Sequence, residues 1–542
     1  MTWMVNAVLL TAAPVLPIAL VAAWLLPYLR RRMSVLLIVA PFPALAASVL
    51  AVGPAVTFWR GLVPMTLSLD VPRAILLGVC AALWVAAAVY SVAERHGRPV
   101  SYQFAVCWLL TLAGNVGVFV TADLASFFLS YTLVSIPAYG LITDDDTSEA
   151  RRAGAVYMAY TVLGETLLLM AFALLAAATP GGVLTIRDVL AALAGSPWRG
   201  ATLALLISGF GMKIGLVSLH VWMPLTYRAA PIPAASVLSG AAVNAGVIGL
   251  IRFLPFGVAL PMAGTALATV GFFGAFYGVA VGLTQVNPKI VLAYSSVSQM
   301  GLIAAVLGVA LAAGDPAAGR PVVFYAANHT LVKGALFLGV GLAAAGPLRR
   351  QPVLLLPAFV LVLGLAGLPL TGGALAKLAL KGRFGSGLPA TLSGFSAAAT
   401  TLLMLHFMRL VTGPVVRDPV AAPIRLTGPY LVLAGLSVVI PWILYPLATG
   451  ASRIGALARV PLWGSLWPVL LGVLLASLLY PVRDYIAQIP HRYPRPVGVR
   501  RVAIRYGEVI EYAESELRRW QTATVSVLLV AALLGVAMLI AR

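Results

Sequence analysis

Runs of about 20 apolar residues recur along the whole chain, and this feature limits its fold more than any other. A helix of about 20 residues spans the hydrocarbon core of a bilayer, where only helices or closed barrels satisfy every backbone polar group. About sixteen such spans fit the sequence on a hydropathy reading. The composition agrees, because 61% of the 542 residues are hydrophobic and only 10% are charged. The sequence therefore predicts an all-α polytopic membrane protein.

Loops rich in arginine predict the orientation of the chain. Clusters at 30–32, 94–98, 144–152, 347–352 and 483–519 all fall on one side of the predicted bundle. Cytoplasmic loops carry the excess of basic residues, so we expect a multi-pass protein of the cytoplasmic (inner) membrane with both termini outside. The net charge of +20 is then loop charge and predicts no nucleic-acid partner. The first residues, MTWMVNAVLL, lack the basic region of a signal peptide, which predicts a retained helix.

The lysines are placed differently from the arginines. They are Lys213, Lys289, Lys333, Lys377 and Lys381, and the first four lie in or at the start of apolar spans. Arginine stays protonated in proteins, whereas a desolvated lysine can lose its proton. A titratable cation at membrane depth predicts a proton relay or an ion path. For Lys213 and Lys333 we favour that interpretation over snorkelling or a structural ion pair, and for Lys289 the two readings are balanced.

Acidic residues at membrane depth are rarer still. Most of the 16 acids lie in loops. Only Glu165, in YTVLGETLLLMAF, is clearly within a span, and Asp123, in VFVTADLASFF, is at a helix junction. One deep acid is therefore available to pair with the deep lysines, and such pairing favours the charged form of both partners.

Two stretches rich in proline and glycine interrupt the apolar pattern. Residues 224–233 read PLTYRAAPIP, and residues 364–373 read GLAGLPLTGG. Unwound backbone at membrane depth lines a cavity or is buried in protein. A lysine beside an interrupted span occurs twice, at Lys213 and Lys377, which favours two related halves of the kind found in transporters built from inverted repeats.

The last part of the chain differs from the rest. Residues 483–520 combine helical periodicity of apolar residues with many charges, which predicts an amphipathic segment on the cytoplasmic membrane surface. At about 1.5 Å per residue it would reach at most roughly 57 Å. Residues 521–542 then form a predicted transmembrane anchor.

Motifs for redox or hydrolytic chemistry are missing from the sequence. It contains no CxxC, GxGxxG or P-loop, so we predict no cofactor and no metal site. Cys80 and Cys107 lie in apolar runs and are read as packing residues. The chain has no predicted enzymatic site of its own, which leaves open whether it belongs to a quinone- or hydrogenase-type oxidoreductase complex.

Four long motifs resemble the proton-translocating antiporter-like membrane subunits. In order they are KIGLVSLHVWMPLTYRAAPIPAASVLSGAAVNAGVIGLIRF (213–253), PKIVLAYSSVSQMG (288–301), YAANHTLVKGALFLGVG (325–341) and GLPLTGGALAKLALK (367–381). LSLDVPRA (67–74) resembles the segment before the family's third helix. Such subunits occur in respiratory complex I, Mrp cation/proton antiporters, membrane-bound hydrogenases, formate hydrogenlyases and inorganic-carbon uptake complexes.

The resemblance implies a fold with about 14–16 transmembrane helices, including two inverted five-helix repeats that contain broken helices. The corresponding divisions are 1–100 for N-terminal transmembrane helices, 101–255 for the first repeat, 256–413 for the second repeat, 414–482 for C-terminal transmembrane helices, 483–520 for the surface segment and 521–542 for the anchor.

The resemblance also implies roles for buried polar residues. Lys213 and Lys377 match the lysines of the two broken helices, and Glu165 matches the acid of the helix before the first. Lys289, His329 and Lys333 match a central relay. Tyr325, His329 and Lys333 are spaced four apart on one predicted helix face, and His220 follows Lys213 by two helical turns. The predicted relay is Glu165, Lys213, His220, Lys289, His329, Lys333 and Lys377, with Asp123, Thr132, Asn244, Tyr325, Lys381 and His406 as accessory candidates.

Two positions depart from the family pattern. Thr132 stands where the family usually has a glutamate, and Asn244 stands where many members have a lysine. Neither side chain carries a charge. The first half therefore lacks two of its usual titratable groups.

Three functional hypotheses follow. The leading one is a subunit that translocates protons, or Na⁺, within a multi-subunit membrane complex. The alternatives are a membrane subunit of an energy-coupled bicarbonate or CO₂ uptake complex, and a non-pumping scaffold with a degenerate channel. Each predicts other membrane subunits, the lipid bilayer and a soluble or peripheral catalytic subunit as partners.

Overall fold

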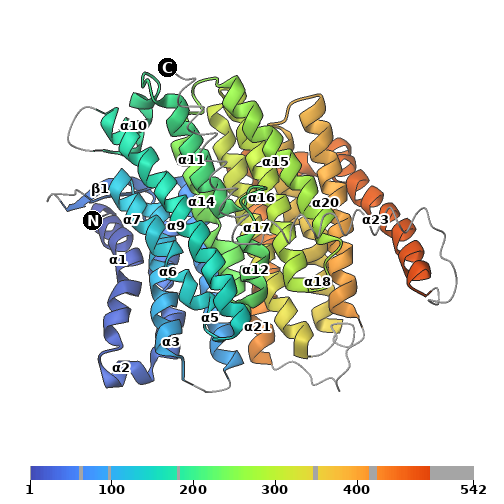
Figure 1. Ribbon diagram of the computed structural model, residues 1–542, viewed down its shortest axis with the longest axis horizontal. Helices are drawn as coiled ribbons and strands as arrows, with labels where there is room; N and C mark the ends of the chain where they lie inside the picture. Colours follow the sequence, from blue (N-terminus) through green and yellow to red (C-terminus); the bar gives the residue numbers. More distant parts are fainter. Residues whose placement is uncertain are drawn as a thin grey trace.

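The computed structural model describes residues 2–59, 65–95, 99–179, 184–345, 352–413 and 424–488. Within these ranges thirteen helices are long and apolar enough to cross a membrane. They stand side by side in one wide bundle (Figure 1). The predicted fold class, a helical polytopic membrane protein, is therefore confirmed, while the inverted repeats and their boundaries stay predictions.

The helices are, in chain order, α1 (Thr2–Ala23), α2 (Pro27–Arg31), α3 (Met33–Val39), α4 (Phe42–Leu50), α5 (Val71–Glu94), α6 (Tyr102–Val120), α7 (Leu124–Ser135), α8 (Ala138–Ile142), α9 (Ser148–Ala177), α10 (Ile186–Leu193), α11 (Arg199–Ile214), α12 (Trp222–Ala229), α13 (Ile232–Val237), the π-helical η1 (Leu238–Ala242), α14 (Asn244–Phe253), α15 (Pro261–Gly282), α16 (Pro288–Ala313), the 3-10 turn η2 (Pro316–Ala318), α17 (Gly319–Ala345), α18 (Pro352–Ala366), α19 (Gly372–Lys381), α20 (Leu388–Thr412), α21 (Ile424–Thr449), α22 (Arg453–Ala456) and α23 (Arg459–Gln488).

The predicted surface segment and anchor fall mostly beyond Gln488, outside the described residues. Residues 483–488, which we assigned to the surface segment, continue α23 instead.

Short polar side chains begin several of the membrane helices. Asp70, Ser101, Asp123, Thr147 and Thr371 each accept a hydrogen bond from the backbone N–H three residues ahead. The first backbone N–H groups of a helix have no intrahelical partner, and an N-cap side chain satisfies one of them. Helix starts are thereby fixed by the sequence.

The first interrupted span breaks earlier than predicted. The helix α11 ends at Ile214, and the chain is left-handed at Gly215 (φ 71°) and Ser218 (φ 74°) before α12 begins at Trp222. A non-glycine residue rarely takes a positive φ, so Ser218 marks a backbone that its surroundings hold in place. The hydropathy reading takes residues 201–221 as one span, which is too long by seven residues because α11 ends at Ile214. The prolines at 224–233 lie in α12 and at the start of α13.

The second interruption falls within the predicted stretch 364–373. The helix α18 ends at Ala366, and Gly367 (φ 103°) and Leu370 (φ 71°) are left-handed before α19 begins at Gly372. A Cβ at Gly373 would lie 1.7 Å from the carbonyl oxygen of Gly364. Only glycine fits there, because the returning backbone touches the end of α18.

An antiparallel β-hairpin is the one strand pair in the described residues, and the sequence did not predict it. It joins β1 (Gly53–Trp59) to β2 (Met65–Leu69). The Asp123 carboxylate accepts hydrogen bonds from the backbone N–H groups of Thr66 and Ser126, each at 2.8 Å. The two carboxylate oxygens of Asp123 thus connect β2 to the start of α7. Asp123, an accessory relay candidate, therefore has a structural role at this junction.

Helix α17 forms the centre of the bundle. Its residues 321–340 are all buried inside the protein, and it packs against α5, α13, α16, α19 and α21. Around it, small residues allow close approach of helices: Cβ atoms at Gly264 and Gly271 of α15 would meet backbone atoms of α16 at 2.2 and 2.4 Å. Helices in membranes commonly associate through such small residues.

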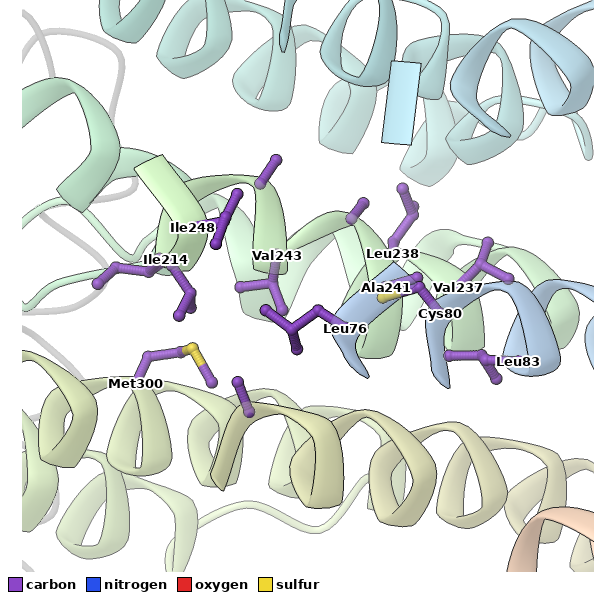
Figure 2. Packing of buried hydrophobic residues seen from close by; sticks show 14 of the residues in the cluster. Leu76, Cys80, Leu83, Ile214, Val237, Leu238, Ala241, Val243, Ile248 and Met300 are labelled. Atoms are coloured by element: carbon purple, nitrogen blue, oxygen red, sulfur yellow. The ribbon is translucent and has the colours of Figure 1, made fainter. Parts of the chain in front are cut away.

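Figure 2 shows apolar packing beside this centre. Leu76, Cys80 and Leu83 of α5 contact the segment Val237–Val243. Cys80 is 2% exposed and carries no disulfide, as the sequence predicted for a packing residue.

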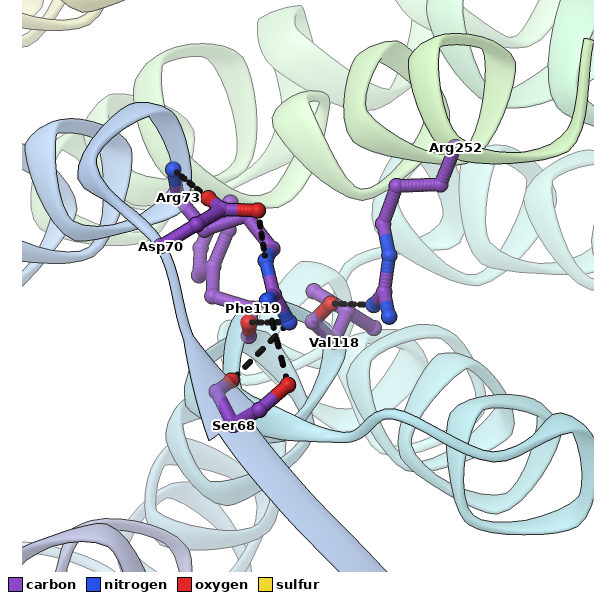
Figure 3. Close-up of polar contacts among 6 residues, drawn as sticks. All are labelled: Ser68, Asp70, Arg73, Val118, Phe119 and Arg252. Atoms are coloured by element: carbon purple, nitrogen blue, oxygen red, sulfur yellow. Dashed lines mark hydrogen bonds and ion pairs between the residues drawn. The ribbon is translucent and has the colours of Figure 1, made fainter. Parts of the chain in front are cut away.

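Two arginines close the end of α6 (Figure 3). Arg73, from α5, donates from Nη1 to the Phe119 and Ser68 carbonyl oxygens at 3.2 and 2.9 Å. Arg252, from α14, donates from Nη1 to the Val118 carbonyl oxygen at 3.2 Å. The last four carbonyls of a helix lack intrahelical partners. The two guanidinium groups therefore supply hydrogen bonds to carbonyl oxygens that would be costly to leave unpaired away from water.

This arrangement predicts that Arg73→Ala lowers the free energy of unfolding by about 1–3 kcal/mol, the cost of an unsatisfied buried acceptor. Thermal unfolding in detergent measures the change. Arg73 and Arg187 line one groove of the protein, and Arg187 is exposed there. Arg187→Ala is therefore the control. Equal melting temperatures for the two variants would show that Arg73 does not hold the end of α6.

Candidate functional site

The first predicted pair, Glu165 and Lys213, shares one internal cavity. Glu165 lies midway along α9, and Lys213 lies in the last turn of α11, immediately before the interruption. Their side chains line the cavity together with Ser135, Tyr157 and Trp222. Its volume is about 20 Å³, which exceeds the roughly 10–15 Å³ that one water molecule requires.

Lys213 is held by hydroxyl and aromatic groups rather than by a direct ion pair with Glu165. Its Nζ donates to Ser135 Oγ at 2.8 Å and lies 5.8 Å from the Tyr157 ring centroid and 5.9 Å from that of Tyr131. Glu165 Oε1 is buried without a hydrogen-bond partner among the described residues. A water-bridged pair fits this arrangement and stays a prediction.

Thr132 lies next to Glu165 but does not line the cavity. Its hydroxyl is buried beside Glu165 but makes no well-formed hydrogen bond with any described residue. The position where the family usually has a glutamate is thus next to the deep acid of the chain. A glutamate at position 132 would therefore place a second carboxylate next to that of Glu165.

The central candidates lie along α17. His329 and Lys333 are completely buried, and Tyr325 is 3% exposed. Lys333 Nζ donates to the Leu292 carbonyl oxygen of α16 at 2.7 Å. Neither ring nitrogen of His329 has a hydrogen-bond partner among the described residues. Two polar nitrogens left this way in an apolar interior mark a place where water would be bound.

Tyr325 connects the central helix to the second half. Its hydroxyl donates to Gln299 Oε1 of α16, and Gln299 Nε2 donates to Thr400 Oγ1 of α20 at 3.1 Å. The sequence did not single out Gln299, because a lone amide in an apolar span has no distinctive spacing. Only the packing of three helices reveals its position.

Lys289 reaches the interrupted region from another helix. It lies in the first turn of α16, as expected, and is half-buried. Its Nζ donates to the Ala230 carbonyl oxygen at 2.6 Å. Ala230 directly follows α12, and with Pro231 it separates α12 from α13. The lysine therefore satisfies a carbonyl that the end of α12 leaves without an intrahelical partner.

Lys377 does the same at the second interruption. Its Nζ donates at 2.8 Å to the carbonyl oxygen of Ala366, the last residue of α18. Lys377 and Lys381 line one cavity of about 60 Å³, which Ser393 and Trp467 also border. That volume holds a few water molecules at roughly 10–15 Å³ each.

His406 lies beyond this cavity, in α20. Its Nε2 is 2.7 Å from the Gln285 carbonyl oxygen, in the segment between α15 and α16. The structure places it apart from Lys377 and Lys381, since it does not line their cavity.

The expected relation between Lys213 and His220 is wrong. Because α11 ends at Ile214, His220 lies in the unwound segment and not two turns along the same helix. Its ring packs against Tyr277 and Tyr294, with centroid distances of 5.2 and 6.1 Å. His220 therefore faces α15 and α16, away from the Lys213 cavity.

Asn244 occupies the interface between α14 and α17. Its Nδ2 donates to Thr330 Oγ1 at 2.7 Å and to the Gly240 carbonyl oxygen at 2.9 Å. Thr330 Oγ1 also donates to Gly240. The amide nitrogen is thus bound twice, whereas the amide oxygen Oδ1 has no hydrogen-bond partner among the described residues, and Asn244 is completely buried.

The candidate sites consist mainly of buried groups that can exchange protons. No group of three or more His, Cys, Asp or Glu side chains that could hold a metal ion occurs in the described ranges. The buried groups are amines, hydroxyls, imidazoles and one deep carboxylate, which can accept or release protons.

Comparison with known proteins agrees with this architecture. The model of the family "NADH:quinone oxidoreductase/Mrp antiporter, TM" matches residues 121–402, just over half of the chain. An uncharacterised Mycobacterium tuberculosis protein is 35% identical over 208 residues, which are 38% of this chain and 32% of that protein. NAD(P)H-quinone oxidoreductase chain 4 of Microcystis aeruginosa is 31% identical over 280 residues, which are 50% of this chain and 47% of that protein. The matched parts thus make up less than half of these curated relatives.

A solved structure shares the fold over nearly the whole chain. A chain of the Mrp complex from Dietzia sp. DQ12-45-1b superposes with a TM-score of 0.69 and 20% sequence identity. The similarity covers 88% of this chain and 99% of the Dietzia chain.

Proposed function

This chain belongs to the NADH:quinone oxidoreductase/Mrp antiporter transmembrane family, and we propose that it translocates protons as a subunit of a multi-subunit membrane complex. The observation that carries this proposal is the cavity that Glu165 and Lys213 share at the end of a broken helix. A carboxylate and an amine that meet in a small, buried, water-sized space form a switchable charge pair.

The chemistry of the pair suggests how it works. When Glu165 is ionised, it stabilises the ammonium form of Lys213 across the cavity. When the two separate, burial favours the neutral amine, and Lys213 releases its proton to the next acceptor. Ser135 and the faces of Tyr131 and Tyr157 hold the charged amine in the meantime.

The other buried lysines extend the path. Lys289, Lys333 and Lys377 each donate to a backbone carbonyl oxygen. Lys289 and Lys333 lie on α16 and α17, which follow α9 and α11 across the bundle toward α18 and α20 (Figure 1). Lys377 lies on α19, which packs against α18. We propose that His329 joins Lys333 in the central relay and that Lys381 assists Lys377.

The orientation belongs to the same proposal. Arg95 pairs with Asp144 at 3.1 Å, so the loops after α5 and α8 meet at one side of the bundle. Both loops belong to the arginine-rich set. We propose that this side is cytoplasmic, and that other membrane subunits and a peripheral catalytic subunit complete the complex.

A non-pumping scaffold is the second candidate function. The uncharged residues Thr132 and Asn244 favour it, because they stand where the family pattern has titratable groups. Proton flux of the reconstituted complex distinguishes the two candidates directly.

The first test is Lys213→Ala in the intact complex. We expect it to abolish coupled proton uptake in liposomes, read with an enclosed pH-sensitive dye, because the switchable amine is removed. Arg187→Ala is the control, since Arg187 is an exposed basic residue outside the proposed relay, and it should retain most of the flux. Normal flux in Lys213→Ala at full expression and assembly would refute the relay.

The second test is Thr132→Glu, with Thr132→Gln as its uncharged control of similar size. A second carboxylate beside Glu165 shares a proton with it at neutral pH, because adjacent like charges resist ionising together. We expect the pH dependence of proton uptake to move toward higher pH in Thr132→Glu and to stay unchanged in Thr132→Gln. An identical pH profile in both variants would mean that this cavity takes no part in transport.

A further inference from the structure

The route between the two halves raises a chemical difficulty. If Lys213 and Lys333 exchange protons, as the proposed function requires, a group between them must accept and release a proton. Asn244 is an amide whose N–H₂ group is bound to Gly240 and Thr330. An amide of this kind has no exchangeable charge to pass on.

A different set of buried groups lies between the two lysines. Ser239 belongs to η1, the one π-helical turn among the described elements, and its Oγ is 3.2 Å from Ser296 Oγ of α16. Both serines are completely buried. Single π-helical turns recur at functional sites because they displace a side chain from its α-helical position. Figure 2 shows the surrounding segment Val237–Val243 packed beside α5.

Ser296 reaches the central lysine through a shared acceptor. Ser296 Oγ donates to the Leu292 carbonyl oxygen at 3.1 Å, and Lys333 Nζ donates to the same oxygen at 2.7 Å. Two donors on one oxygen atom lie close together, so a rotation of the hydroxyl or one bridging water connects them.

Tyr227 extends the set toward the first half. Its side chain is completely buried, and its hydroxyl lies beside Ser239 without a well-formed hydrogen bond. The ring packs edge-on against Trp222 with centroids 6.0 Å apart, and Trp222 packs against Tyr157 at 5.4 Å. Trp222 and Tyr157 form part of the wall of the Lys213 cavity.

We propose that Tyr227, Ser239 and Ser296 form an uncharged hydroxyl chain that carries protons between the Lys213 cavity and Lys333, in place of a charged residue at 244. A hydroxyl both donates and accepts, so each can receive one proton as it gives up another. Ser296 transfers its proton to the neutral Lys333 amine and takes one from Ser239, which takes one from Tyr227. The Lys213 ammonium returns a proton to Tyr227 through bridging water and becomes the neutral amine, so every hydroxyl ends as it began.

The test compares two serines of one helix. Ser296→Ala removes a hydroxyl of the chain, whereas Ser298→Ala removes an equally buried hydroxyl that donates to Ala275 of α15, at 2.7 Å and off the route. The intact complex is reconstituted in liposomes, and proton uptake is driven by a potassium diffusion potential. We expect flux to fall at least about tenfold in Ser296→Ala, equivalent to about 1.4 kcal/mol of barrier, and to stay within about twofold in Ser298→Ala.

Rescue separates proton transfer from packing. Ser296→Thr keeps the hydroxyl and its bond to the carbonyl four residues earlier, so it should restore most of the flux. Ser239→Ala should reproduce the loss seen in Ser296→Ala. Equal flux in Ser296→Ala and Ser298→Ala, or failure of Ser296→Thr to recover, would overturn the hydroxyl chain while leaving the proposed function intact. Absence of flux in the unmodified complex would instead overturn the proposed function itself.

Discussion

A buried amine needs an oxygen acceptor, and this requirement explains much of the structure. Lys289 and Lys377 donate to the carbonyl oxygens of Ala230 and Ala366, which stand where helices stop. Carbonyls at a helix end have no intrahelical partner, so each of these helix ends supplies an oxygen atom that is free to accept. The interruptions and the lysines therefore depend on each other: the break offers an oxygen atom, and the amine makes the break tolerable at membrane depth.

The sequence predicts the helices well because their cause is local. Apolar length and short polar caps, such as Ser101 and Thr371, act within a few residues of each helix. The hairpin has no such local signal, and the break at residues 215–221 has only Gly215, a left-handed glycine that ends α11. Ser218 takes a left-handed conformation that serine disfavours, and only tertiary packing imposes it. The prolines at 224–233 are visible in the sequence, but they lie beyond the break itself.

The charged part of the candidate site is equally readable, since a lysine or glutamate in an apolar span is rare enough to stand out. Its uncharged part is not. Ser135, Ser296 and Gln299 belong to residue types common in membrane helices. They matter here only because packing places Ser135 beside Lys213, Ser296 beside Ser239 and Gln299 beside Tyr325. The failed expectation for His220 has the same origin, because spacing along a chain gives a common face only while the helix continues.

Residues 321–340 of helix α17 are buried, and two side chains of this helix, five residues apart, bind different neighbours. Thr330 accepts a hydrogen bond from Asn244 of α14, and Tyr325 reaches Thr400 of α20 through Gln299 of α16. A closely packed interior does not deform continuously, so a shift of α17 toward one neighbour must strain or break its bonds to the other. His329 and Lys333 lie on this same helix. The polar contacts of α17 with α14 and α16 therefore also fix the positions of His329 and Lys333, the residues of the proposed central relay.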